Sequence, residues 1–505
     1  MGKTEKICKN IFYRIFAVSF SWLMINVLFF NPFFDYKPYI VLPLAAVWFA
    51  FMALAFRLVE KYERFISQNT IKFLACFFVV LWLTQFVVYS LCAGYPTRDF
   101  ERVFTGAYNY TITGTIQDPY LDYFYKFPNN MPLTIILQFI FRRVYKFGIT
   151  NFFAVGALFN RRCISAAYLF TFLSVRNTMG TKYAAFAVIL LYFCLPLQIY
   201  ISIFYTDTTS MLYPPLIIYF YQTAGKLKGK KKNILFCITM GLIIGLGIKI
   251  KYSVAIALIA VLIRCIIKFA LKKLAAVAVS TTLGFALVSA AFNRFMYKNI
   301  LDKEKAYDMS TPFLAWIAMG VQGDGTHSAD DNHYIWAQET HEEKVEGAKF
   351  LLKARLEYMG PAGYIKFLNA KAVRSFGSGN LDYPNTVSES PMKQNFMIDV
   401  LNPQGRYNAV FDNIIQGYHI LIFLMLCVGA VSGAAGKDRR MFVWQVSSLG
   451  ILLFLLLWEA GTRYLLNYYP VFVSASLAGF VLVFDKIFDV RKTDTLKEEK
   501  QAVIN

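Results

Sequence analysis

The sequence predicts an all-α membrane protein with about twelve transmembrane helices, and three observations support that prediction. Of the 505 residues, 57% are hydrophobic and 16% are charged, whereas about a quarter of the residues in a soluble domain are charged. Apolar runs of the roughly 20 residues that a spanning helix needs recur along the whole chain. Lys and Arg gather in the short segments between these runs, a pattern that orients membrane helices.

Charge and cysteine content exclude two other classes of protein. The formal net charge is +21, which in a soluble protein would favour nucleic-acid binding. No DNA- or RNA-binding motif accompanies the charge, so its expected partners are anionic lipid headgroups. The eight cysteines fall in or beside apolar runs and form neither a disulfide framework nor a CxxC metal site. We therefore expect membrane lipids as partners and no nucleic acid.

The topology follows from the positions of the basic residues. Lys3, Lys6 and Lys9 keep the N-terminus inside, and the lysine-rich segment 226–232 is the strongest inside signal in the chain. Alternating from these anchors places both termini in the cytoplasm, the C-terminal one with Lys486, Arg491, Lys492 and Lys497. The predicted spans are 11–32, 38–56, 72–93, 153–175, 183–204, 207–223, 233–248, 252–270, 273–292, 413–433, 441–459 and 467–485. The same alternation forbids 131–145 from spanning, so an interfacial helix is expected there.

These spans divide the chain into five parts. Residues 1–70 form an added helical hairpin, and 71–292 form a transmembrane core that includes a first outer loop at 93–152. Residues 293–412 form an outer-face loop domain, 413–486 form the C-terminal transmembrane helices, and 487–505 form a cytoplasmic tail. We expect the protein to be a multi-pass protein of the cell membrane.

The first outer loop carries a candidate catalytic pair. Asp99 and Glu101 directly follow the end of a predicted span, where a carboxylate can take a proton from a substrate hydroxyl near the bilayer surface. A tyrosine-rich stretch that includes Tyr125 follows. The sequence Phe127-Pro128-Asn129-Asn130 then turns the chain into the interfacial helix. We predict that Tyr125, Pro128, Asn129 and Asn130 bind substrate.

Two further features lie at predicted outer helix ends. Asp207 stands in a very short outer turn, either as a second site carboxylate or as the N-cap of the next helix, and both roles are compatible. Lys249 and Lys251 end a span on the side where positive charge opposes insertion. Snorkelling to headgroups would explain them, and so would binding of an anionic substrate.

The order of these features resembles the GT-C superfamily of membrane glycosyltransferases. That family has an acidic residue in the first outer loop, a proline-led juxtamembrane helix and a second acidic residue at the next outer turn. Here these correspond to Asp99, to 127–132 and to Asp207. The family's basic residue that binds the donor phosphate corresponds to Lys251 or Lys249. The run 241–251 (GLIIGLGIKIK) is similar to its glycine-rich helix ending in lysine.

A late acidic–arginine pair also fits the resemblance. Glu459 and Arg463 stand four residues apart in the sequence WEAGTRY. This spacing would place them on one helical face, where simple pairing of the two charges is the alternative to a role in the site. The sequence departs from the family at two points that bear on the acceptor and the sugar. The first loop has no adjacent Asp-Glu pair, and the proline motif reads Pro-Asn-Asn.

The resemblance implies a reaction as well as a fold. A hexose-type sugar would move from a polyprenyl-phosphate donor to a glycan, lipid or protein acceptor of the cell envelope. Lys249, Lys251 and Arg463 would bind the donor phosphate, and Asp99, Glu101 and Asp207 would supply the catalytic carboxylates, with Glu459 binding substrate. A single displacement would invert the anomeric carbon. No cofactor is required, although the scheme allows a divalent metal.

The long outer loop allows a metal site that its composition does not favour. His327, Asp330, Asp331 and His333 carry ligand-type side chains, but clusters of this kind are usually solvated. Within the same loop, 311–320 is expected to rest on the membrane surface and 345–358 to form an amphipathic helix. No metal site is therefore predicted.

Two other functional classes remain open. A transporter or flippase for lipid-linked saccharides would also carry charge at bilayer depth, but the chain shows no internal repeat of the transporter kind. A polysaccharide polymerase or ligase would share the large outer loop and would usually carry arginine-rich sites.

Overall fold

The computed structural model describes residues 2–504, with side chains through Phe488. Arg491, Lys492 and Lys497 of the predicted tail lie outside the described side chains. The predicted all-helical architecture is confirmed, because the described residues contain helices and a single isolated β-bridge between Gly94 and Pro391.

The helices follow one another through the whole chain. Their bounds are α1 (Gly2–Phe29), α2 (Pro38–Lys61), α3 (Glu63–Gln68), α4 (Thr70–Cys92), α5 (Arg98–Thr113), α6 (Tyr120–Lys126), η1 (Pro128–Asn130), α7 (Met131–Tyr145), α8 (Phe152–Met179), α9 (Thr181–Tyr192), α10 (Leu195–Ile199), η2 (Tyr200–Ser202), α11 (Thr206–Thr209), α12 (Tyr213–Thr223), α13 (Lys230–Ile250), η3 (Tyr252–Val254), α14 (Ala255–Ile267), α15 (Leu271–Asn299), α16 (Lys303–Met309), α17 (Phe313–Met319), α18 (Ala329–Trp336), α19 (His341–Phe376), α20 (Tyr383–Thr386), α21 (Phe396–Leu401), α22 (Asn408–Ala434), α23 (Phe442–Leu457), η4 (Thr462–Tyr468) and α24 (Tyr469–Ile504).

Seven of these helices within the described chain are long and apolar enough to cross a membrane, or eight if the bent pair formed by 181–192 and 195–202 is one span. The remaining predicted spans correspond to shorter helices such as α12, α14 and α23, and to α8, which carries Arg161 and Arg162 near its middle. Many side chains of α4 and α15 are exposed although they are apolar, as expected for helices whose solvent is lipid.

Two predicted spans are interrupted, and proline explains both. The span predicted at 183–204 bends by 67° between α9 and α10, where Pro196 lies in the first turn of α10. The span predicted at 207–223 splits into α11 and α12, with Pro214 and Pro215 at the start of α12. Proline lacks the N–H that a continuing helix needs and disfavours helical geometry in the residue before it. These breaks create the turn that carries Asp207.

The helix α7 has the bounds predicted for the interfacial helix, 131–145. It packs against α5, and its buried side includes Leu133, Leu137 and Phe141. Its depth in a bilayer stays a prediction. The N-terminal hairpin predicted as an addition packs against the C-terminal helices, since α1 and α2 both contact α22.

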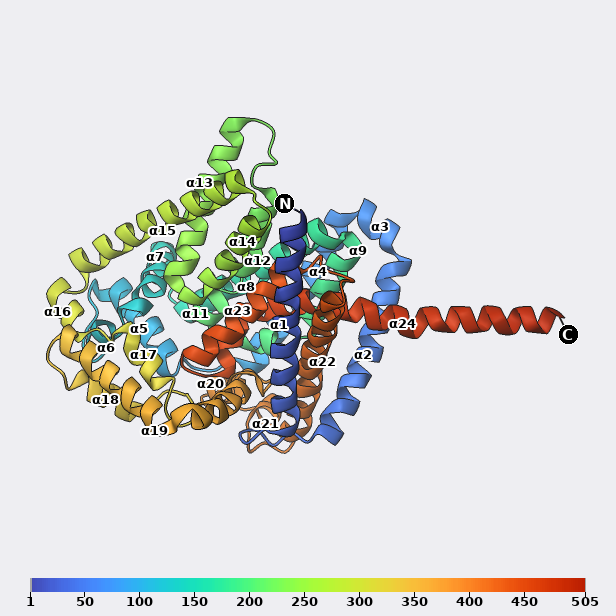
Figure 1. The fold of residues 1–505 in the computed structure, drawn as a ribbon. Coiled ribbons are helices and arrows are strands. Elements are labelled where there is room, and N and C mark those ends of the chain that lie inside the picture. The colour runs from blue at the N-terminus through green and yellow to red at the C-terminus, as the bar shows by residue number, and fades with distance from the viewer. Residues whose placement is uncertain (1, 505) are drawn as a thin grey trace.

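The segment 300–407 gathers at one end of the helix bundle, where α16 to α21 lie (Figure 1). The predicted amphipathic helix at 345–358 is part of α19, which extends to Phe376 with a kink at Gly360 (φ +57°) before Pro361. The predicted surface segment 311–320 contains α17, which packs on α19.

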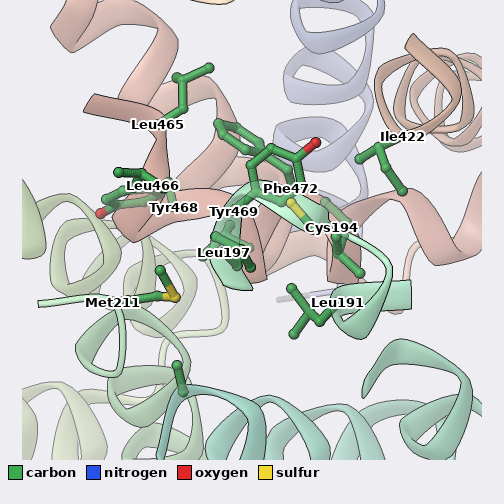
Figure 2. Close-up of a cluster of buried hydrophobic side chains, with 14 of the residues drawn as sticks. Leu191, Cys194, Leu197, Met211, Ile422, Leu465, Leu466, Tyr468, Tyr469 and Phe472 are labelled. Atoms are coloured by element: carbon green, nitrogen blue, oxygen red, sulfur yellow. The ribbon is translucent and has the colours of Figure 1, made fainter. Parts of the chain in front are cut away.

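A dense hydrophobic cluster lies where η4 runs into α24 (Figure 2). Leu465, Leu466 and Phe472 are fully buried there and meet Leu197 of α10 in the same cluster. The junction is also tied to η3, because Tyr468 Oη donates to the Ser253 carbonyl at 2.9 Å. The segment that begins at Gly461 is therefore anchored to a densely packed core.

Candidate functional site

The described part of the chain encloses a cavity of about 1250 Å³ at the end of the bundle covered by segment 300–407. Its lining comes from the start of α5, the α6–α7 junction, α11, the end of α13, the α23–η4 junction and segment 310–336. The cavity thus brings together segments that are distant in the sequence. Of the predicted site residues, those that line it are Asp99, Pro128, Asn129, Asn130, Asp207, Lys249, Lys251, Glu459 and Arg463.

Asp207 is the centre of a buried ion cluster. Its side chain is 3% exposed, Lys251 Nζ lies 2.5 Å from Oδ1, and Arg463 Nε lies 3.4 Å from Oδ2. Asp207 lies within α11, and the N-cap of that helix is Tyr205 without a side-chain bond, so the N-cap alternative for Asp207 is not what the structure shows. Two cations on one buried carboxylate leave one positive charge in excess.

Lys249 adds a second cationic group. It lies in the last turn of α13, lines the cavity, and donates to Asn293 Oδ1 at 3.1 Å. Among the described residues no carboxylate lies within ion-pair distance of Lys249, whereas Lys251, just beyond the helix end, is paired with Asp207. The cavity therefore presents a lysine whose charge has only a neutral amide for a partner.

Asp99 lies at the start of α5 and is held by two tyrosines. Tyr123 Oη donates to Oδ1 at 3.0 Å, and Tyr205 Oη approaches Oδ2 at 3.4 Å. Asn130 joins the same network, because its amide donates to Tyr123 Oη at 2.5 Å. Burial, followed by the charge of Asp99, holds the pKa of Tyr123 well above its usual range, so the phenol stays a hydrogen-bond donor.

The backbone before α5 fixes this position of Asp99. Tyr95 N donates to the Ser390 carbonyl at 2.7 Å, and Met392 N donates to the Ala93 carbonyl at 2.9 Å. These bonds join the two outer loops that the sequence predicted separately. Arg98 then adopts a left-handed conformation (φ +53°), which turns the chain into α5.

Glu459 is a buried carboxyl group on the same cavity. It is 7% exposed, and the neighbouring Tyr464 favours its ionised form, which opposes the pKa increase caused by burial. Burial raises the pKa of Glu459 to about 7, against the opposing effects of Tyr464 and Arg463. The expectation that Glu459 and Arg463 share a helical face is wrong, because 459–461 is not helical and Arg463 pairs with Asp207. Gly461 separates the non-helical residues that include Glu459 from η4, which carries Arg463.

Lys371 of α19 lies behind Glu459 and was not predicted. It is fully buried and donates to the Gly320 carbonyl, and burial lowers its pKa to about 8. The nearby turn is tied to the cavity by Ala460 N, which donates to the Gly325 carbonyl at 2.7 Å. Lys371 therefore anchors the turn that follows α17, and that turn is bonded to Ala460, the residue after Glu459.

Two predicted site residues lie outside the cavity lining. Glu101 accepts a hydrogen bond from Tyr120 at 3.0 Å. Tyr125 is buried in a small hydrophobic cluster and accepts from Asp302 N at 3.1 Å. The helix α5 turns Glu101 away from Asp99, as residues two apart on a helix do not share a face.

The loop residues with ligand-type side chains do not assemble into a metal site. In the described part of the chain no group of three or more His, Cys, Asp or Glu side chains has the proximity that a metal needs. Asp331 is instead engaged by Arg355 through two bonds of 2.6 and 2.8 Å. His327 bonds Asn332 at 2.8 Å.

Sequence reasoning missed the aromatic lining of the cavity. Trp316 and Trp336 come from the segment 310–336, and Trp458 follows α23. Polar residues from the chain after α19, such as Asn380 and Asp412, also line the cavity. The side-chain amide of Asn380 donates to Asp412 Oδ2 at 3.0 Å. No local pattern marks these residues, because only the fold brings their segments to one cavity.

Several solved structures have some similarity to the chain. One is the Archaeoglobus fulgidus oligosaccharyltransferase tethered with an acceptor peptide, with 16% identity, a TM-score of 0.42, and coverage of 82% of this chain and 50% of that chain. Another is AglB from Archaeoglobus fulgidus with an inhibitory peptide and a dolichol-phosphate (13% identity, TM-score 0.39, 83% and 51% covered). The chain thus spans about half the length of these two structures.

A third is ArnT from Cupriavidus metallidurans bound to undecaprenyl phosphate, with 14% identity, a TM-score of 0.34, and coverage of 81% of this chain and 77% of that chain. No curated protein matches the chain.

A family model matches residues 3–481. That range covers nearly the whole chain, including every segment that lines the cavity. The chain therefore belongs to the family described as conserved hypothetical integral membrane proteins.

Proposed function

We propose that the protein is a membrane glycosyltransferase that moves a hexose-type sugar from a polyprenyl-phosphate donor to an acceptor of the cell envelope. The observation that carries the proposal is the excess of cations over the buried carboxylate Asp207. Lys251, Arg463 and Lys249 all line the cavity that also holds Asp99. The combination offers a site for an anion beside a base for an acceptor hydroxyl.

A lipid phosphate suits the cationic side of the cavity. Lys249 and Lys251 sit at the end of the apolar helix α13, and Arg463 lies in η4, the segment after α23. A lipid-linked headgroup would approach there with its chain still in the membrane. In surroundings of low dielectric constant, attraction between fixed cations and a phosphate is stronger than in water. The same cations would stabilise the negative charge that develops on the leaving phosphate.

Asp99 suits the role of base. Its carboxylate would take the proton of an acceptor hydroxyl while the hydroxyl oxygen bonds to the anomeric carbon of the sugar. The bond from that carbon to the phosphate oxygen breaks in the same step, and the electron pair leaves with the lipid phosphate. A single displacement of this kind inverts the anomeric carbon. The scheme requires no cofactor.

The location and the acceptor belong to the same proposal. The cavity would open on the outer face of the cell membrane, with both termini in the cytoplasm, as the basic segments predict. The acceptor would be an envelope glycan, lipid or protein.

The test incubates purified protein in lipid nanodiscs with polyprenyl-phosphate sugars and measures release of the free lipid phosphate. The proposal expects release that depends on an added acceptor and is lost in Asp99→Asn. Movement of intact sugar lipid across a vesicle membrane without cleavage would instead identify a flippase and overturn the proposal.

A further inference from the structure

The cavity has a wall of aromatic side chains that the proposed chemistry does not use. We call Phe127, Trp316 and Trp336 the aromatic wall. The ring of Phe127 lies 5.8 Å from that of Trp316 and 5.7 Å from that of Trp336. All three line the cavity and are only partly buried. Flat apolar ring faces thus border the hollow, with α17 and α18 of the segment 300–407 supplying both tryptophans.

Asn332 supplies an unsatisfied polar group on the same wall. It lines the cavity and is 2% exposed. Its amide nitrogen is engaged with His327 Nε2 at 2.8 Å, while its buried Oδ1 has no hydrogen-bond partner among the described residues. Buried acceptors are normally satisfied, so this oxygen is suited to accept a hydrogen bond from a ligand hydroxyl.

The aromatic wall is connected to the proposed base. The ring of Tyr123 lies 5.0 Å from that of Phe127, and Tyr123 Oη donates to Asp99 at 3.0 Å. A ligand resting on the wall would therefore lie next to the carboxylate that is proposed to take the acceptor proton.

The charges around the wall are already balanced. Lys126 Nζ lies 4.6 Å from the ring centre of Trp336 but is paired with Asp122 at 2.8 Å. Trp336 itself is held by a bond from Nε1 to Thr311 Oγ1 at 3.1 Å. A second anion would gain little here, and a purely apolar chain would leave Asn332 unsatisfied. A neutral ring with an apolar face and a hydroxyl rim satisfies both features.

We propose that the aromatic wall and Asn332 form a subsite for a hexopyranose ring. The inference rests on the proposed function and adds the role of α17 and α18, which position one sugar of the reaction against Asp99. The ring belongs either to the donor or to a saccharide acceptor, and both present the same chemistry.

The first arm of the experiment measures binding of citronellyl phosphate and of its glucosyl, galactosyl, mannosyl and N-acetylglucosaminyl conjugates to the full-length protein in nanodiscs. If the ring is the donor's, at least one conjugate binds more tightly than the bare lipid phosphate. That gain should fall about tenfold in Trp336→Leu, Trp316→Leu and Asn332→Ala, while affinity for the bare lipid phosphate stays unchanged.

The second arm titrates maltose, cellobiose and chitobiose and follows tryptophan fluorescence. If the ring is the acceptor's, one of these sugars binds to the wild type and binds at least tenfold more weakly to the three variants. The matched control is Trp82→Leu, since Trp82 is 47% exposed on α4 and bonds Ser165 away from the cavity. Melting temperatures identify any variant that fails to fold, and the remaining variants decide.

The inference is overturned if neither the conjugates nor the free sugars bind better to the wild type than to the variants. It is also overturned if Trp82→Leu loses as much binding as the wall variants. Failure of the proposed function looks different, because the wild type would then bind no citronellyl phosphate at all while the sugar titrations remain informative.

Discussion

Lys251 Nζ lies 2.5 Å from Asp207 Oδ1, and this pair joins two segments that are 44 residues apart in the chain. Asp207 comes from the short helix between two proline-broken segments, and Lys251 comes from the extended residue after α13. The pair holds the end of α13 against the turn, so that Lys249 in the preceding helical turn also reaches the cavity.

Lys249→Met should weaken binding of a lipid phosphate by about ten- to a hundredfold, because a hydrogen bond to a charged group contributes about 1.5–3 kcal/mol. The fold should be little affected, since Lys249 bonds only an amide oxygen. The affinity for citronellyl phosphate tests the expected loss of binding, and the melting temperature tests the expected retention of the fold. Unchanged affinity in Lys249→Met would remove this lysine from the anion site.

Lys251→Met should lower thermal stability, because it leaves the buried Asp207 carboxylate with Arg463 alone. Breaking one partner of a buried ion pair typically costs about 3–5 kcal/mol, and the remaining arginine should reduce that loss. The double variant Lys251→Met with Asp207→Asn should recover stability in a thermal melt without recovering lipid-phosphate binding. If the double variant does not recover stability, the loss of the Lys251–Asp207 pair is not the source of the lost stability.

Asp99→Asn should lower turnover by about 10²–10⁴ while donor binding and folding persist, because the amide cannot accept a proton. Glu101→Gln tests the competing carboxyl that lies outside the cavity lining, and should have a much smaller effect. Asp118→Asn is the matched control on the exposed loop. Rate measurements in which Glu101→Gln is inactive and Asp99→Asn is active would reassign the base.

Glu459 should make stability depend on pH. Its pKa is about 7 in the folded protein and 4.5 ordinarily, so the folded state favours the protonated form. The resulting stability is fully present below about pH 4.5 and is lost as the pH rises toward 7, by about 3 kcal/mol in total.

Melting temperatures of wild type and Glu459→Gln between pH 4.5 and 7 check this dependence, since the glutamine variant should lose that slope. Glu357→Gln, which alters an exposed carboxyl, should keep it. Equal slopes in wild type and Glu459→Gln would show that Glu459 titrates normally.

The amino-acid sequence alone indicates that lipid surrounds the helices of this protein, and it marks the positions of most of these helices. Apolar runs and basic flanks mark segments such as α2, α4 and α13, and the bounds of α7 were predicted to the residue. Lys249 and Lys251 were also predictable as unusual, because positive charge at that helix end opposes the orientation rule. Such signals are local, and composition and periodicity contain them.

Which of the predicted site residues contact one another depends on the tertiary structure. Asp207 pairs with Lys251 and Arg463 because two loops and a proline-broken helix converge in the fold. No spacing in the sequence encodes the proximity of these three residues. The sequence spacing of Glu459 and Arg463 was misleading, since a helical face requires helical backbone and 459–461 has none. Likewise Trp316 and Trp336 reach the cavity through the packing of α17 to α19, which depends on contacts between distant segments rather than on local pattern.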